Sequence, residues 1–343
     1  MQFREHVPLA PYTTFGIGGP ARWFAEAVHE DEALEAVRFA RERSLPLFLL
    51  GGGSNLLVSD EGFPGLVLHL ASKGIEQNGG LFRAAAGENW DSFVSHAVSL
   101  GYAGIECLAG IPGTVGGTPV QNVGAYGQEV AETIVRVRTL DLETLAFTEM
   151  EAADCAFAYR RSLFNSTARG RYLVTRVDYR LTHNGQPRLN YADLKKYFVN
   201  QPKPSLVEVA TAVRAIRREK GMLLVDGDPD CRSAGSFFKN PVISAGHYAR
   251  LATAHGSAIP SYPAHAEHVK LPAAWLLDQA GFHKGFAQGR AGISSRHTLA
   301  LINRGNATAA DILALRDTII AAVEAKFGIP LEPEPVWLGP SHN

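Results

Sequence analysis

The sequence predicts an α+β protein of three lobes, and three observations support this. A chain of 343 residues is too long for one ordinary core and indicates two or three domains. Apolar residues make up 46% of the chain and charged residues 20%, which is typical of a folded globular protein. The pattern of helices and strands also changes twice along the chain. We therefore predict lobes at residues 1–72, 73–204 and 205–343.

The first lobe is predicted to be a small α/β unit. Residues 31–43 place apolar side chains at helical spacing, with acidic residues in the first turn. Residues 45–50 (LPLFLL) and 65–70 (GLVLHL) are short apolar runs beside glycines, which favours buried strands.

The second lobe is predicted to be richer in strands. One helix is expected where an apolar face begins at Trp90 and ends at Gly101. Residues 133–150 alternate and contain a break, which predicts a hairpin, and residues 171–181 alternate again. Residues 182–204 hold three prolines and three asparagines, and we interpret them as the connection to the third lobe.

The third lobe is predicted to be mixed, with a helix at each end. Its first helix opens with a capping box formed by Ser205 and Glu208. The last helix starts near Thr308, buries one apolar face, and ends at Gly328 just before Pro330.

Charge and cysteine content exclude several classes of protein. Lys and Arg total 33 and Asp and Glu total 34, so no charge excess indicates a nucleic-acid or membrane-surface partner. Cys107, Cys155 and Cys231 fit no zinc pattern, and an odd number of cysteines fits no closed disulfide framework. The N-terminus lacks the apolar run of a signal peptide, and no apolar run reaches about 18 residues. We expect a cytoplasmic monomer without a metal site.

Glycine-rich loops are the first functional signal. GGGSN at 51–55 directly follows a predicted strand, and its backbone N–H groups can gather around an anion such as a pyrophosphate. A tight turn without a ligand is the alternative. Further glycine-rich loops at 110–117, 122–129 and 15–20 favour one extended ligand approached closely by the backbone, as a dinucleotide would be. The sequences of these loops match neither the Rossmann dinucleotide-binding fingerprint nor the P-loop motif.

Seven motifs occur in order over residues 13–339. They are TTFGIGGPA, LGGGSNLLVSD, AGENWDSFV, AGIPGTVGGTPVQNVGAYGQE, FAYRRSLF, SAGSFFKNP and LEPEP. With these motifs the chain resembles the UDP-N-acetylenolpyruvoylglucosamine reductase (MurB) family, the flavoenzymes of bacterial cell-wall precursor synthesis. The glycine loops alone would support only the wider class of FAD-binding proteins built like p-cresol methylhydroxylase and vanillyl-alcohol oxidase.

The resemblance implies non-covalent FAD in the first two lobes, within about residues 13–184, and a UDP-sugar on the third lobe. NADPH is the implied co-substrate. The pyrophosphate would lie on the loops at 51–55 and 113–117. The residues implied to hold the cofactor are Gly51, Gly52, Gly53, Ser54, Asn55, Gly113, Thr114, Gly116, Gly117, Asn122, Gly124 and Ala125.

The implied reaction is the reduction of UDP-N-acetylglucosamine enolpyruvate to UDP-N-acetylmuramate. A hydride reaches the terminal vinyl carbon first. This addition builds negative charge next to the substrate carboxylate, and the charge needs fixed donors or a cation until a proton reaches the neighbouring carbon. The resemblance assigns this stabilisation to Arg160 and Glu334, and it makes Ser236 the proton donor.

The resemblance also implies a substrate site and a longer subtype, in which a tyrosine-bearing loop closes over the substrate. By that match Tyr191 is the loop tyrosine. Val336 stands where some members carry an arginine, so Arg232 or Arg290 is expected to supply that contact. The residues implied to bind substrate are Tyr126, Tyr159, Tyr191, Lys220, Lys239, Asn240 and Lys270.

Several alternatives stay open from the residues alone. Ser236 could cap a turn, Arg161 competes with Arg160, and Glu332 competes with Glu334. A flavin oxidase that uses oxygen would share the glycine loops. A catalytically silent protein that senses UDP-sugars would share them too, but it would not need the serine, arginine and glutamate together.

Overall fold

The computed structural model describes residues 1–201, 203–256, 259–265 and 267–339, and the chain divides into two compact units. The first unit comprises Met1–Val7, Pro20–Gly53 and Phe63–Glu219. The second comprises Pro8–Gly19, Ser54–Gly62 and the described residues from Lys220 onward. Two short segments that precede residue 63 therefore fold with the C-terminal part of the chain.

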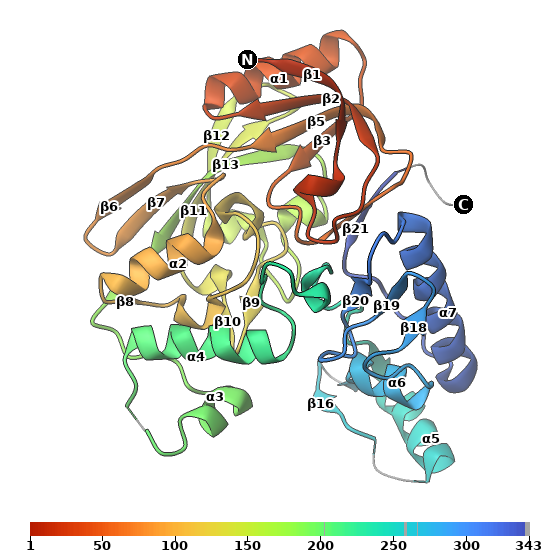
Figure 1. Ribbon diagram of the computed structural model, residues 1–343. Coiled ribbons are helices and arrows are strands. Elements are labelled where there is room, and N and C mark those ends of the chain that lie inside the picture. The colour runs from red at the N-terminus through yellow and green to blue at the C-terminus, as the bar shows by residue number, and fades with distance from the viewer. Residues whose placement is uncertain (202, 257–258, 266, 340–343) are drawn as a thin grey trace. The chain divides into compact units, whose positions relative to one another are not determined.

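The predicted α/β region at the N-terminus is confirmed as part of the first unit (Figure 1). Strands β2, β5 and β3 pair in parallel, and β1 lies at the edge of the same sheet. The alanine-rich face of helix α1 packs with Leu66 and Leu68 of β5 in one buried cluster. The elements are β1 (Phe3–Pro8), β2 (Pro20–Ala27), α1 (Glu30–Glu42), β3 (Leu47–Leu50) and β5 (Phe63–Leu70).

A second sheet of the first unit has the strand order β12-β11-β13-β7-β6, and every neighbouring pair is antiparallel. Because side chains alternate along a strand, Val137, Val177 and Tyr179 all reach the core. Trp90 and Phe93 of helix α2 belong to this core, as the predicted helix face requires. The elements are β6 (Ile75–Asn78), β7 (Leu81–Ala85), α2 (Trp90–Ser99), β11 (Ile134–Asp141), β12 (Phe147–Glu151) and β13 (Tyr172–Arg180).

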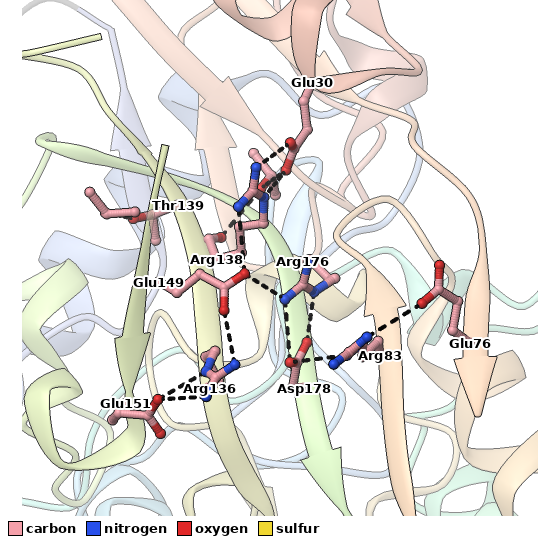
Figure 2. Close-up of polar contacts among 12 residues, drawn as sticks. Glu30, Glu76, Arg83, Arg136, Arg138, Thr139, Glu149, Glu151, Arg176 and Asp178 are labelled. Carbon is pink, nitrogen blue, oxygen red and sulfur yellow. Dashed lines mark hydrogen bonds and ion pairs between the residues drawn. The ribbon is translucent and has the colours of Figure 1, made fainter. Parts of the chain in front are cut away.

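The other face of this sheet carries a ladder of charges, shown in Figure 2. Arg138 of β11 lies between Glu30 of α1 and Glu149 of β12, with Nε 2.8 Å from the Glu30 carboxylate. Arg176 of β13 joins Glu149 to Asp178. Opposite charges placed across neighbouring strands favour one register of those strands. Because Glu30 lies on α1, its ion pair with Arg138 also ties this helix to the sheet.

The predicted connection at 182–204 is more ordered than expected, and this corrects the sequence interpretation. It holds strand β14 (Thr182–His183), which pairs with β8 (Tyr102–Ala103), and helix α3 (Ala192–Tyr197). Helix α4 (Leu206–Glu219) then buries its apolar face in the core of the first unit. Because this face packs in the first unit, the boundary between the two units follows Glu219 and not residue 204. A short hairpin of β9 (Gly124–Ala125) and β10 (Gln128–Glu129) completes this unit's strands.

The second unit is built from small sheets and three α-helices among its described residues. The predicted last helix, α7, is confirmed, and it ends at Gly328 with a φ of 62°. Its apolar face lies in a core shared with Phe237 and Phe238. The elements are β4 (Leu56–Val58) paired with β21 (Val336–Leu338), β15 (Val242–Ser244), α5 (Ala245–His255), β16 (Tyr262–Pro263), β17 (His268–Lys270), α6 (Ala273–Gln279), β18 (Ala287–Gln288), β19 (Ala291–Ile293), β20 (Leu301–Asn303) and α7 (Ala309–Phe327).

The cysteines at 107, 155 and 231 are buried free thiols. Burial raises the pKa of Cys155 to about 12, and burial also raises the pKa of Cys107. A thiol with a raised pKa is a poor nucleophile at neutral pH. Within the described ranges, no group of three metal-ligating side chains occurs and no helix is long and apolar enough to cross a membrane.

Candidate active site

Two of the predicted glycine loops meet backbone to backbone in the first unit. A Cβ atom on Gly52 would lie 2.5 Å from Cα of Gly113, and one on Gly51 would lie 3.0 Å from Oγ1 of Thr114. Gly116 is just as confined, because its Cβ would lie 2.6 Å from that of Ala86. Only glycine allows this approach. The two loops therefore pack directly against each other, and their predicted contact with a pyrophosphate stays a prediction.

The first glycine loop continues into the second unit at Ser54 and Asn55. There the side-chain amide of Asn55 donates a hydrogen bond to the carbonyl oxygen of Glu334 at 3.3 Å. The backbone N–H of Val336 donates to the carbonyl of Asn55 at 2.9 Å. A predicted cofactor residue and a predicted catalytic residue, far apart in sequence, are thus joined directly.

The serine motif lies against the same C-terminal segment. The backbone N–H of Glu334 donates to the carbonyl of Phe237 at 2.8 Å, and Phe238 pairs with Pro333 in an antiparallel bridge. Phe237 and Phe238 are buried, as predicted for core residues, whereas Ser236 is half-buried. The structure therefore brings Ser236 and Glu334 onto neighbouring chain segments.

Glu332 and Glu334 differ in their surroundings. Glu332 is exposed and forms an ion pair with Lys239. Glu334 is half-buried, and both its N–H and its carbonyl are tied to the motifs described above. These surroundings favour Glu334 over Glu332 as the acidic group of the site.

The TTFGIGGPA motif has a structural explanation that the sequence did not provide. Thr14 donates a hydrogen bond to the Ser233 carbonyl at 2.5 Å, and Phe15 packs edge-on against Phe237 with ring centres 6.4 Å apart. A Cβ atom on Gly19 would lie 2.1 Å from the Asp60 carbonyl oxygen. Close chain packing in the second unit therefore accounts for this glycine without a ligand.

Arg160 lies in the first unit and is held in a strained conformation. Its φ is 54°, in the left-handed region that few residues other than glycine adopt. Its guanidinium donates to the carbonyl of Gly124 at 2.8 Å and lies 5.2 Å from the ring centre of Tyr159. Arg161 is more exposed than Arg160. Backbone strain that surrounding contacts maintain is often found at functional sites, which favours Arg160.

Asn122 and Tyr126 share this backbone strain, with φ values of 45° and 48°. The buried Asn122 amide donates to Glu129 at 2.8 Å and to the Ala158 carbonyl at 3.0 Å. Asn122 therefore ties its own loop to the segment just before Arg160. The geometry gives it a structural task in addition to its predicted contact with the cofactor.

Arg217 is a candidate site residue that the sequence reasoning missed. It is almost fully buried on helix α4, and its Nε donates to the carbonyl of Gly110 at 2.9 Å. Burial lowers the pKa of its guanidinium, while the charge of Asp91 and a hydrogen bond with Tyr126 act in the opposite direction. An arginine within a buried apolar stripe is the signal that could have revealed it.

The residues predicted to bind the UDP-sugar have structural partners as well. The side chain of Asn240 accepts a hydrogen bond from the N–H of Ala273 at 2.9 Å, at the start of α6. Lys270 lies on β17 with its ammonium 5.9 Å from the ring centre of Tyr262. Lys220 is half-buried at the start of the second unit's last segment. Their predicted contacts with phosphate stay predictions.

The residue expected to replace the arginine missing at Val336 is not singled out by the geometry. Val336 lies on β21 at an exposed position. Arg232 is exposed, and Arg290 donates to the Asn306 carbonyl at 3.3 Å.

Comparisons with known proteins identify the family. Residues 228–338 match the UDP-N-acetylenolpyruvoylglucosamine reductase C-terminal domain, and residues 21–144 match an FAD binding domain. The chain is 46% identical to UDP-N-acetylenolpyruvoylglucosamine reductase of Thermobifida fusca, with 98% of each chain covered. The chain belongs to the UDP-N-acetylenolpyruvoylglucosamine reductase family. It is therefore an oxidoreductase.

Two further relatives extend over the whole chain. The reductase of Neisseria meningitidis serogroup B is 42% identical, with 99% of each chain covered. The crystal structure of the reductase (MurB) from Thermus caldophilus aligns with a TM-score of 0.69 at 28% identity, covering 98% of this chain and all of that one. The expected fold class, an FAD-binding domain joined to an α+β C-terminal domain, is confirmed.

Proposed function

We propose that this reductase converts UDP-N-acetylglucosamine enolpyruvate to UDP-N-acetylmuramate with NADPH, in cytoplasmic peptidoglycan precursor synthesis. The observation that carries the proposal is the meeting of three motif segments in the second unit, at Asn55, Phe237 and Glu334. Each segment belongs to a different motif of the family resemblance. A protein that only sensed UDP-sugars would not need them together.

The FAD-binding part is proposed to hold the cofactor on the closely packed loops that contain Gly51, Gly52 and Gly113. Bound FAD supplies the hydride-transfer chemistry that amino-acid side chains lack. The protein contributes binding, orientation and electrostatics. The C-terminal domain is proposed to hold the UDP-sugar.

Arg160 is proposed to stabilise the negative charge that develops beside the substrate carboxylate. A guanidinium presents several N–H donors in a rigid plane and stays charged at neutral pH. Its bond to the Gly124 carbonyl and the confined glycine at that position fix the guanidinium before substrate arrives. A preorganised donor of this kind typically contributes about 10²–10³-fold to kcat.

Ser236 is proposed to donate the proton to the carbon next to the reduced one, and Glu334 to donate a hydrogen bond to the enolate. The flanking residues Phe237 and Phe238 are locked in the core, so the serine backbone has little freedom to move. The pairing with residues 332–334 holds the two segments in register.

The test is anaerobic absorbance spectroscopy of the purified protein. Addition of NADPH should bleach the flavin absorbance, and the enolpyruvyl UDP-sugar should then restore it. A colourless protein would overturn the assignment of FAD. A yellow protein that is bleached but recovers only when oxygen is admitted would instead be a flavin oxidase.

A further inference from the structure

One arginine of the second unit holds the segment 220–236, which ends at the proposed proton donor. The guanidinium of Arg296 contacts two carboxylates of this segment: its Nε donates to Asp230 at 2.9 Å, and another of its nitrogens forms an ion pair with Asp228. Asp230 is almost fully buried and also accepts a hydrogen bond from the hydroxyl of Ser295 at 2.6 Å. Arg296 and its neighbour therefore fix the middle of the segment.

These ion pairs are largely shielded from water. The side chain of Arg296 is 28% exposed, that of Asp228 is 22% exposed, and that of Asp230 is 9% exposed. Burial acts to raise the pKa of Asp230, but the hydrogen bonds from Ser295 and Arg296 and the charge of Arg296 outweigh it, so the net shift is downward. Loss of the arginine would leave two partly buried carboxylates without the cation that pairs with both, which destabilises their arrangement.

The start of the segment packs against the same guanidinium. Gly221 directly follows Lys220 and has a φ of 65°. A Cβ atom on Gly221 would lie 3.1 Å from Nε of Arg296 and 3.2 Å from Oγ of Ser294. Arg296 therefore contacts the segment beside Lys220, a residue predicted to bind substrate, as well as at the two aspartates.

Residues 294–303 also support the segment on both sides of Ser236. Before the serine, the carbonyl of Arg232 accepts a hydrogen bond from the N–H of Asn303 at 2.9 Å. Directly after the serine, the N–H of the next residue donates to the carbonyl of Leu299 at 2.8 Å. These backbone contacts survive a side-chain substitution, whereas the ion pairs with the aspartates can be removed one by one.

We propose that Arg296 is a positioning residue that fixes the segment 220–236 and thereby places the Ser236 hydroxyl for proton donation. The anchoring rests on the contacts of the described residues, while the effect on the reaction rests on the proposed function. A proton donor must lie within hydrogen-bond reach of the atom that it protonates, and a displacement of about 1 Å can cost about 10²-fold in rate. Loss of the anchor should therefore slow reoxidation of the flavin by the UDP-sugar and spare its bleaching by NADPH.

The experiment compares Arg296→Ala with Arg316→Ala in the FAD-loaded protein. Arg316 is a matched control, because its side chain is 23% exposed and also forms an ion pair with an aspartate, Asp317, in the second unit. Hydrogen exchange of the amides at 221–235 is measured for both variants, and anaerobic stopped-flow absorbance follows both half-reactions. Arg296→Lys keeps the charge but loses the forked donor, and it takes the place of Arg296→Ala throughout if that variant does not fold.

A double substitution tests whether Arg296 acts through the serine. Arg296→Ala is combined with Ser236→Ala, and the double variant is compared with Ser236→Ala alone. If Arg296 serves only to place Ser236, its removal should change the rate of reoxidation by less than about twofold once the serine is absent. A general loss of structure would instead slow both backgrounds equally.

We expect Arg296→Ala to raise exchange at 221–235 by about tenfold, because local opening becomes easier. Reoxidation of the flavin by the enolpyruvyl UDP-sugar should slow by about tenfold, and bleaching by NADPH should keep its rate. Arg296→Lys should show the same pattern with smaller changes. Arg316→Ala should match the unsubstituted protein in all three measurements.

Three results would overturn the proposal. Unchanged exchange in Arg296→Ala would show that Arg296 does not anchor the segment. Raised exchange with an unchanged rate of reoxidation would show that the anchor does not place the proton donor. An equal loss with and without Ser236 would show that Arg296 acts by another route, and in each of these cases the proposed function would still stand.

Failure of the proposed function has a different signature. If the unsubstituted protein does not reduce the UDP-sugar at all, the proposed function falls and the catalytic part of this proposal falls with it. The exchange measurement needs no substrate, so it still decides whether Arg296 anchors the segment.

Discussion

The side-chain amide of Asn55 donates a hydrogen bond to the Glu334 carbonyl, joining residues 279 positions apart in the sequence. This bond links the end of the glycine loop to the segment that carries the proposed acidic group. The position of Glu334 thus depends on a residue that the sequence assigned to the cofactor.

Replacing Asn55 should therefore affect turnover as well as cofactor binding. We expect Asn55→Ala to lower kcat and to cost about 1 kcal/mol of stability, the usual value of one lost hydrogen bond. Gln77→Ala is the control, because Gln77 makes a comparable amide-to-carbonyl bond on an exposed hairpin. Stability is measured by urea unfolding, and kcat is measured with saturating FAD. A normal kcat in Asn55→Ala would show that the link to Glu334 is dispensable.

Ser236→Ala should separate the two half-reactions. Loss of the proton donor is expected to lower kcat by about 10²–10⁴-fold while the bleaching of the flavin by NADPH keeps its rate. Stopped-flow absorbance follows both steps. Ser99→Ala, at an exposed position on α2, should leave both unchanged. Full activity in Ser236→Ala would assign the proton donor elsewhere.

Gly52→Ala should abolish FAD binding. The added methyl group would lie 2.5 Å from Cα of Gly113, so one of the two loops would have to move. Gly246→Ala lies in α5, where the Cβ atom meets nothing closer than 3.8 Å, and it should bind FAD normally. The ratio of flavin to protein absorbance after purification measures the effect. A normal ratio in Gly52→Ala would mean that this close approach does not shape the cofactor site.

The charge ladder should make stability depend on pH. Burial acts to raise the pKa of Glu30, but hydrogen bonds from Arg138 and Thr175 and the charge of Arg138 outweigh it, so the net shift is downward. A carboxyl with a lowered folded-state pKa stabilises the protein above its unfolded pKa, and this stabilisation is lost as pH falls through the folded pKa. Glu30→Gln should therefore destabilise the protein at pH 7 by about 1 kcal/mol, given its partial exposure.

The pH dependence itself is the sharper test of this ladder. The stability difference between Glu30→Gln and the unsubstituted protein should shrink as pH falls from about 5 to about 3. Urea unfolding across this range measures it. Glu42→Gln, at an exposed position near the end of α1, should show no difference at any pH. A constant difference for Glu30→Gln would mean that the charge of Glu30 contributes nothing.

Local patterns predicted the elements well. The helix faces of α1, α2 and α7, the hairpin of β11 and β12, and strand β13 all lie where periodicity and capping residues placed them. Each of these signals is local, because the spacing of apolar residues matches the period of the element itself. The motif residues, too, stand out in the sequence without reference to the fold.

Tertiary structure decided the relations among distant segments. The sequence alone determined the elements named above, the glycine-rich loops and the family motifs. Only the fold assigned α4 to the first unit, joined Asn55 to Glu334, and placed Phe15 against Phe237. The physical reason is that such contacts depend on which apolar faces pack together and on which loops are brought close by that packing. The local spacing of residues along the chain does not specify these contacts.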